Sequence, residues 1–89
     1  MLELKPRRNS TLKWRIYREK AVIYPAFGMN EIGTKIFLLC DGKRTVKDII
    51  GILTQEYEGD ERQIAEATLR FLETLVKNQM IFMQKSKVI

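Results

Sequence analysis

The chain of 89 residues contains no histidine and a single cysteine, Cys40. Protein zinc sites are built mainly from imidazole and thiolate ligands, so the composition predicts no metal site and no cofactor. One cysteine cannot close an internal disulfide bond. Histidine is also the commonest general base in enzymes. The composition therefore predicts no catalytic residues and favours a binding protein over an enzyme.

Two sequence features used by other protein classes are missing as well. Glycine-rich phosphate loops of the GxGxxG or GxxxxGK[ST] kind are not found, and no apolar run approaches the 18 residues or so that span a membrane. The first ten residues carry charge but lack the apolar core of a secretory signal. We therefore expect a cytoplasmic protein without membrane contact.

The composition is that of one small folded domain, because 45 % of the residues are hydrophobic and 30 % are charged. The net charge of +5 arises within residues 1–20, which hold seven lysines and arginines but only two glutamates. A helix that enters a nucleic-acid groove is expected to be basic, whereas the last helical segment mixes both signs. Nucleic acid is thus a disfavoured partner, although a winged-helix nucleic-acid binder that uses the basic arm stays an alternative.

Residues 30–40 have the pattern of a helix with one apolar face. Asn30 is a favourable N-cap, and the helix is expected to end at Cys40 or Asp41. The residues on its predicted apolar face are Ile32, Ile36, Leu39 and Cys40.

Gly42 follows this helix and can adopt the left-handed conformation that ends helices, and Thr45 is placed to cap a second helix. The second helix is expected to end near Tyr57, and Asp60 is expected to cap a third. The predicted buried face of the second helix consists of Val46, Ile49, Ile50 and Leu53. Short corners of this kind occur in helix-turn-helix and winged-helix domains.

Ahead of the helices, alternating apolar residues predict a half-buried strand over residues 12–17, with Trp14 as a core residue and Ile16 on the same face. Residues 21–24 predict a second strand, and residues 27–29 a third. The expected fold is α+β and winged helix-turn-helix-like, with a three-stranded antiparallel sheet followed by three helices. Residues 1–11 are predicted as an extended basic arm, 12–84 as a single domain and 85–89 as a tail.

The third helix carries two adjoining apolar stripes when its residues are placed at 100° per step. We expect the first stripe to pack on the other two helices, and it consists of Ile64, Thr68, Phe71 and Leu75. The second stripe needs another cover and consists of Ala65, Leu69, Leu72 and Val76. The apolar segment 80–83 could supply that cover by packing back, and so could a bound partner.

The sequence of the corner between the first two helices resembles that of the coenzyme PQQ synthesis protein D (PqqD) family. The fold of this family is also called the peptide-recognition element of ribosomal peptide maturation systems. The matching residues are Ile36, Leu39, Cys40, Asp41, Gly42, Arg44, Thr45, Val46 and Ile49. Flanking residues extend the resemblance over most of the chain.

This resemblance implies a protein that is not an enzyme and that binds the leader of a precursor peptide. It further implies a partner enzyme, often a radical S-adenosylmethionine protein, to which the peptide is presented. In the family the leader adds as a strand beside the third strand, in the cleft which that strand forms with the third helix.

The residues themselves are compatible with strand addition. Lys13 and Arg15 decorate the first strand as charged residues that protect a sheet edge, whereas residues 26–29 carry no charge and predict an open edge. The candidate peptide-binding residues are Ala26, Phe27, Gly28 and Met29 on the edge, Leu69, Leu72 and Val76 on the facing wall, and Arg70 and Glu73 as readers of leader charge. A homodimer joined through the same edge, or a structural subunit of a larger assembly, remains an alternative.

Overall fold

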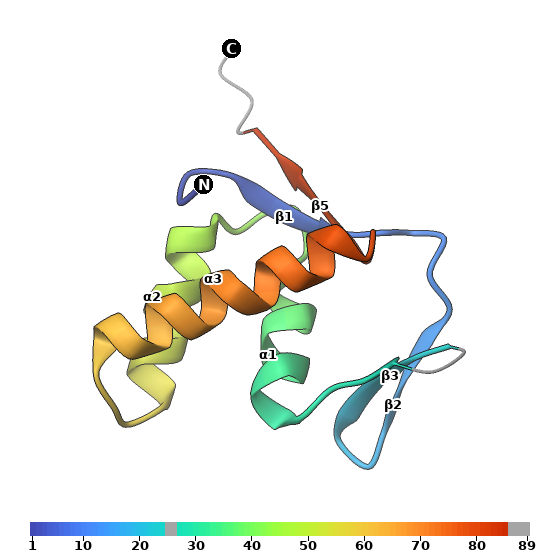
Figure 1. Ribbon diagram of the computed structural model, residues 1–89, viewed down its shortest axis with the longest axis horizontal. Coiled ribbons are helices and arrows are strands. Elements are labelled where there is room, and N and C mark those ends of the chain that lie inside the picture. The colour runs from blue at the N-terminus through green and yellow to red at the C-terminus, as the bar shows by residue number, and fades with distance from the viewer. Residues whose placement is uncertain (25–26, 86–89) are drawn as a thin grey trace.

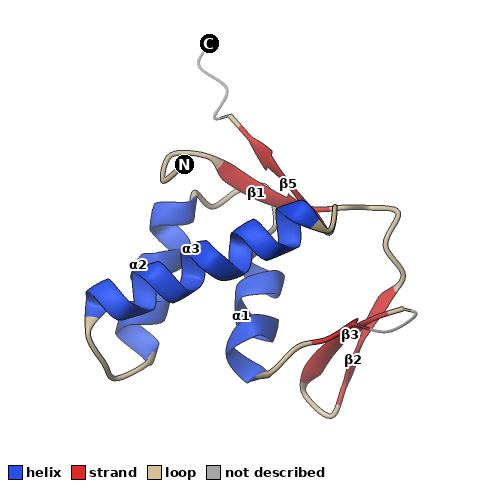
Figure 2. Cartoon of the chain, viewed as in Figure 1, coloured by secondary structure: helices blue, strands red, loops and turns tan. Residues whose placement is uncertain are grey.

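The computed structural model describes residues 1–24 and 27–85, and shows three helices packed beside antiparallel strands (Figures 1 and 2). The elements in chain order are β1 (Lys5–Arg8), β2 (Trp14–Tyr17), β3 (Lys20–Ile23), β4 (Phe27–Gly28), α1 (Glu31–Leu39), α2 (Val46–Glu56), α3 (Glu61–Lys77) and β5 (Ile81–Gln84). The strands form two separate sheets, with the orders β1-β5 and β2-β3-β4. The predicted α+β class with three helices and antiparallel strands is confirmed.

The sheet β2-β3-β4 corresponds to the predicted meander. A two-residue turn joins β2 to β3, and both of its residues have positive φ angles, 50° at Arg18 and 67° at Glu19. Positive φ at both central positions defines the turn whose twist matches that of the paired strands. Lys20, which lies between the strands predicted over residues 12–17 and 21–24, is the first residue of β3 and pairs with Tyr17. The last strand, β4, is only two residues long.

The corner between α1 and α2 forms as predicted. Gly42 has a φ angle of +78°, in the left-handed region that glycine adopts without strain. The hydroxyl of Thr45 accepts a hydrogen bond from the N–H of Asp48 over 3.0 Å, and the carboxylate of Asp48 accepts one from the N–H of Thr45 over 3.0 Å. This reciprocal capping box fixes the start of α2, and therefore the direction in which α2 leaves the corner.

The core lies between the helices and the inner faces of both sheets. Its buried hydrophobic residues are Ala21, Ile23, Met29, Ile36, Phe37, Cys40, Val46, Ile49, Leu53, Leu72, Leu75, Met80 and Ile81. The ring of Trp14 packs edge-on against the buried Phe37 with the centroids 5.1 Å apart. Trp14 is partly buried and contacts the core, in line with the prediction that it anchors the sheet. Two predicted inward residues, Ile16 and Ile32, are instead 45 % and 47 % exposed.

The sheet of β1 and β5 was not predicted. Residues 1–11, expected as an extended arm, contain β1, which pairs with β5 in the register Pro6↔Met83 and Arg8↔Ile81. The N–H of Gly42 donates to the Pro6 carbonyl over 2.8 Å, which ties β1 to the helical corner as well. The two ends of the chain therefore close the fold together. Among the described residues, no helix combines the length and the apolar composition needed to cross a membrane.

Candidate functional site

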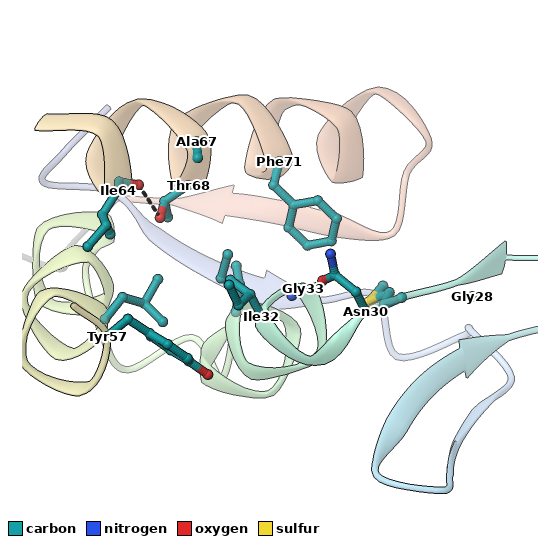
Figure 3. A pocket seen from close by; sticks show the side chains of 12 residues that line it. Gly28, Asn30, Ile32, Gly33, Tyr57, Ile64, Ala67, Thr68 and Phe71 are labelled. Atoms are coloured by element: carbon teal, nitrogen blue, oxygen red, sulfur yellow. Dashed lines mark hydrogen bonds between the residues drawn. The ribbon is translucent and has the colours of Figure 1, made fainter. Parts of the chain in front are cut away.

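A groove of about 440 Å³ opens between the end of β4, the first turn of α1, the end of α2 and one face of α3 (Figure 3). It is lined by Gly28, Met29, Asn30, Ile32, Gly33, Ile36, Leu53, Tyr57, Ile64, Ala67, Thr68 and Phe71. None of these residues carries a formal charge. A concave, mostly apolar site of this size with a few polar groups is the usual form of a binding site.

The groove has a buried floor and an exposed rim. Three residues of the floor, Met29, Ile36 and Leu53, are at most 5 % exposed and belong to the core. Ile32 lies on the rim, with 47 % of its surface exposed. Its exposure therefore has a structural explanation, because Ile32 borders the groove and not the core. A bound apolar side chain would therefore remove mainly the rim from water, while the floor is already buried.

The first turn of α1 forms one end of the groove. The side-chain oxygen of Asn30 accepts a hydrogen bond from the N–H of Gly33 over 2.7 Å, so the predicted N-cap is confirmed. Figure 3 shows the Phe71 ring reaching from α3 toward these two residues. A Cβ atom added at Gly33 would lie 3.0 Å from the tip of that ring, closer than such atoms normally approach. Glycine at this position therefore lets Phe71 close the end of the groove.

The hydrogen-bonding capacity of Thr68 is already used within α3. Its hydroxyl is buried and donates to the Ile64 carbonyl over 2.8 Å, as drawn in Figure 3. An apolar ligand can therefore cover this hydroxyl at little cost in free energy, because the hydroxyl keeps its hydrogen bond to Ile64.

β4 lies at the edge of its sheet, and the ladder shows which of its main-chain groups face outward. The N–H of Met29 donates to the Ala21 carbonyl over 3.0 Å, and the next pair in this register is Gly28 with Val22. Hydrogen-bonded and non-hydrogen-bonded pairs alternate in an antiparallel ladder. Gly28 therefore directs its N–H and C=O away from β3, toward the open edge beside the groove.

The structure brings only part of the predicted site together. Gly28 and Met29 line the groove, and their role in peptide binding stays a prediction. Ala26 lies outside the described residues, and the structure describes only the backbone of Phe27.

The predicted wall on α3 lies on a different flank. Leu72 is 0 % exposed, so it belongs to the core and offers no surface to a peptide, and Leu69 packs against that core. The other three predicted residues, Arg70, Glu73 and Val76, line a separate hollow of about 490 Å³ together with Met1 and Met83. The physical reason is that β5 returns along α3 and packs against it, which turns the middle of the predicted stripe into core.

Three of the four residues of α3 that line the groove belong to its first stripe. Ile64, Thr68 and Phe71 were predicted to pack on the other helices, and Ala67 was not singled out. Their spacing of three and four residues places them on one face, which was visible in the sequence. The sequence does not indicate that the other helices cover this face only partly, because that depends on how α1 and α2 are placed relative to α3.

Cys40 takes no part in the site. It is 0 % exposed, and its thiol donates to the Ile36 carbonyl over 3.2 Å. Burial raises the pKa of the thiol to about 12, although the nearby charge of Arg8 acts in the opposite direction. The thiol is therefore neutral at physiological pH, in agreement with its predicted role as a small core residue.

Comparisons with known proteins identify the fold and the family. The solved structure of TbiB1 in complex with the TbiA(beta) leader peptide matches with a TM-score of 0.76, covering 84 % of this chain and 93 % of that chain. The two sequences are 16 % identical, so this likeness shows the fold alone. A comparison with curated proteins gives no match. The model of the family described as coenzyme PQQ synthesis protein D (PqqD) matches residues 23–81. Because that match covers well over half of the sequence, the chain belongs to the PqqD family.

Proposed function

We propose that this protein binds the leader of a ribosomally made precursor peptide as an additional strand beside β4. The observation that carries the proposal is the open main chain of Gly28 at the mouth of an uncharged groove. Strand addition needs both features, because main-chain hydrogen bonds supply affinity and pockets for alternate side chains supply selectivity. Family membership and the fold shared with a leader-bound protein support the same role.

The dimensions of the site suit a reversible carrier. Each apolar side chain buried in the groove contributes about 1.5–3 kcal/mol, and each main-chain hydrogen bond about 1 kcal/mol. Ordering a flexible leader costs about 2–5 kcal/mol. About four main-chain hydrogen bonds and two or three apolar anchors together contribute about 7–13 kcal/mol before this cost. The middle of the resulting range corresponds to dissociation constants on the order of 10 micromolar. Binding of this strength captures a peptide and still releases it.

We further propose that the protein is an adaptor with no catalytic activity of its own, which presents the peptide to a modifying enzyme such as a radical S-adenosylmethionine protein. Family membership is the support for this part of the proposal. On this view the chain forms a winged helix-turn-helix-like recognition domain that includes β1 as well as the predicted residues 12–84.

The two flanks of α3 provide a direct test. Ala67 is exposed and lines the groove, whereas Val76 is 39 % exposed and lines the separate hollow. We expect Ala67→Arg to abolish the binding of peptides selected from a random display library, because the new side chain fills the groove. Val76→Arg, the matched control on the same helix, should bind them like the wild type.

Isothermal titration of both variants with the selected peptides measures this difference, and circular dichroism checks that both remain folded. Loss of binding in Val76→Arg alone would place the site on the flank predicted from the sequence. The proposed function would be contradicted if no selected peptide bound the wild type and failed to bind Ala67→Arg.

A further inference from the structure

The outer face of the sheet β2-β3-β4 is basic and aromatic. Ala21 and Ile23 are buried, so the alternate residues of β3 and their partners on β2 face away from the core. The residues on this outer face are Lys13, Arg15, Tyr17, Lys20, Val22 and Tyr24. Both tyrosines are about half exposed, at 52 % for Tyr17 and 47 % for Tyr24.

Arg15 on this face and Arg18 in the adjoining turn contact the tyrosine rings. The guanidinium carbon of Arg15 lies 5.8 Å from the ring centroids of both Tyr17 and Tyr24, and that of Arg18 lies 5.4 Å from the Tyr17 ring. Such contacts hold a guanidinium against an aromatic ring while it keeps its charge. Within residues 1–24 and 27–85, the ion pairs are Lys35–Glu56 and Arg44–Asp41, and neither involves this face.

The register of the sheet connects this face to the open edge. Arg15 lies opposite Val22, and Val22 lies opposite Gly28, so these three residues form one row across the sheet. Residues directly opposite one another point to the same face. A peptide residue that pairs with Gly28 would therefore continue the row and direct its side chain to the outer face. Its two neighbours along the peptide would direct theirs to the inner face, into the groove.

Gly28 leaves space on this row at the edge of the sheet, and Val22 is the one residue of the row between Gly28 and Arg15. Gly28 has no side chain, and a Cβ atom built there would meet no atom within 4 Å. Neighbouring strands lie about 5 Å apart, so β3 would lie about 10 Å from the added strand. An extended lysine such as Lys20 and an acidic side chain of the peptide can together span this distance, and Arg15 adds positive charge farther along the row.

We propose that the peptide taken up beside β4 carries Asp or Glu at the position opposite Gly28, flanked on both sides by apolar residues that enter the groove. The ligand class is therefore an extended segment of the pattern apolar, acidic, apolar. This inference rests on the proposed function, and it adds a charge requirement that the uncharged groove does not impose.

The test compares peptides selected from a random display library on three proteins, with complexes placed in register by cross-strand NOEs to Gly28. On the wild type we expect Asp or Glu opposite Gly28. The variant Arg15→Glu/Lys20→Glu should select Lys or Arg there. The control Lys43→Glu/Lys47→Glu changes the net charge equally at exposed positions outside this face, and should select as the wild type does.

Titration gives the size of the effect. Replacing the acidic residue of a selected peptide by its amide should weaken binding to the wild type by about fivefold, as expected for exposed ion pairs. The same replacement should strengthen binding to Arg15→Glu/Lys20→Glu, because it removes a repulsion between like charges. Circular dichroism verifies that the exposed substitutions preserve the fold.

The outcomes separate this inference from the proposed function. Peptides that occupy the groove but are neutral or basic opposite Gly28, or that are selected identically by all three proteins, would overturn the charge requirement and leave peptide binding intact. No groove-bound peptide at all would overturn both. If a single-stranded oligonucleotide binds the wild type with a steep salt dependence and is lost in Arg15→Glu/Lys20→Glu, the basic face serves nucleic acid and the inference is wrong.

Discussion

Asn30 has two roles at the scale of a single residue. Its side chain caps α1, and it also borders the groove. An N-cap satisfies an N–H group of the first helical turn that has no partner within the helix. The residue that starts α1 thus also shapes the end of the groove beside Phe71.

We expect Asn30→Ala to lower the free energy of unfolding by about 1 kcal/mol, since the N–H of Gly33 loses its acceptor. In a domain of this size the midpoint of thermal unfolding should fall by roughly 4–8 °C. Asn30→Ser, which can still cap the helix, is the control. Equal midpoints for the wild type and the alanine variant in calorimetry would contradict the assigned cap.

The carboxylates of Asp41 and Asp48 make stability depend on pH. Burial acts to raise the pKa of Asp41, but hydrogen bonds from the N–H groups of Lys43 and Arg44, together with the charge of Arg44, outweigh it and lower the pKa. The hydrogen bond from the N–H of Thr45 lowers the pKa of Asp48. Both groups are therefore ionised more readily in the folded state than in the unfolded chain.

A carboxylate whose pKa is lower in the folded protein than in the unfolded chain stabilises the folded protein at pH values above about 4, its pKa in the unfolded chain. This stabilisation is lost as the pH falls through the pKa of the folded protein. Urea unfolding of the wild type should show a loss of stability below about pH 4. Asp41→Asn/Asp48→Asn should be less stable at pH 7 and should lose less on acidification. An identical pH profile for both proteins would exclude these two carboxylates as a cause.

At the scale of elements, the helix starts and the corner were predictable because their signals are local. Asn30, Thr45 and Asp60 act as N-caps, and Gly42 adopts its left-handed conformation, as the sequence indicates. Each depends on residues within one turn of the chain. For the same reason the two-residue turn at Arg18 was placed to within one residue.

The two apolar stripes of α3 were predicted from their spacing, and of the two covers left open for the second stripe the structure shows the returning segment, β5. Helical spacing identifies two apolar stripes, yet the core is centred between them, with Thr68, Leu72 and Leu75 buried. The groove then takes the edge formed by Ile64 and Phe71. Spacing alone cannot determine this rotation, because it depends on β5, which returns from the far end of the chain.

At the scale of the whole molecule, the pairing of β1 with β5 joins the two ends of a small domain (Figure 1). Ile81 on β5 is 0 % exposed and belongs to the core. A domain of this size buries a modest share of its surface and has a net stability on the order of 5–15 kcal/mol. β5 therefore contributes to a small net free energy of unfolding, through the burial of Ile81.

Ile81→Ala should lower the free energy of unfolding by about 2–5 kcal/mol, the usual cost of removing a buried aliphatic side chain. Phe82→Ala, in the same strand but 42 % exposed, should cost clearly less. Urea denaturation of both variants provides the comparison. If Phe82→Ala were the more damaging change, the core side of β5 would be assigned wrongly.

Gly28 offers the most direct test of strand addition. Its N–H points away from β3, so Gly28→Pro removes the donor that an added strand needs while leaving the β3–β4 ladder its own bonds. Gly28→Ala keeps that N–H, and its methyl group enters open space. In titrations with peptides selected on the wild type, binding should be lost in Gly28→Pro and retained in Gly28→Ala. Equal binding by a folded Gly28→Pro protein would contradict peptide capture beside β4.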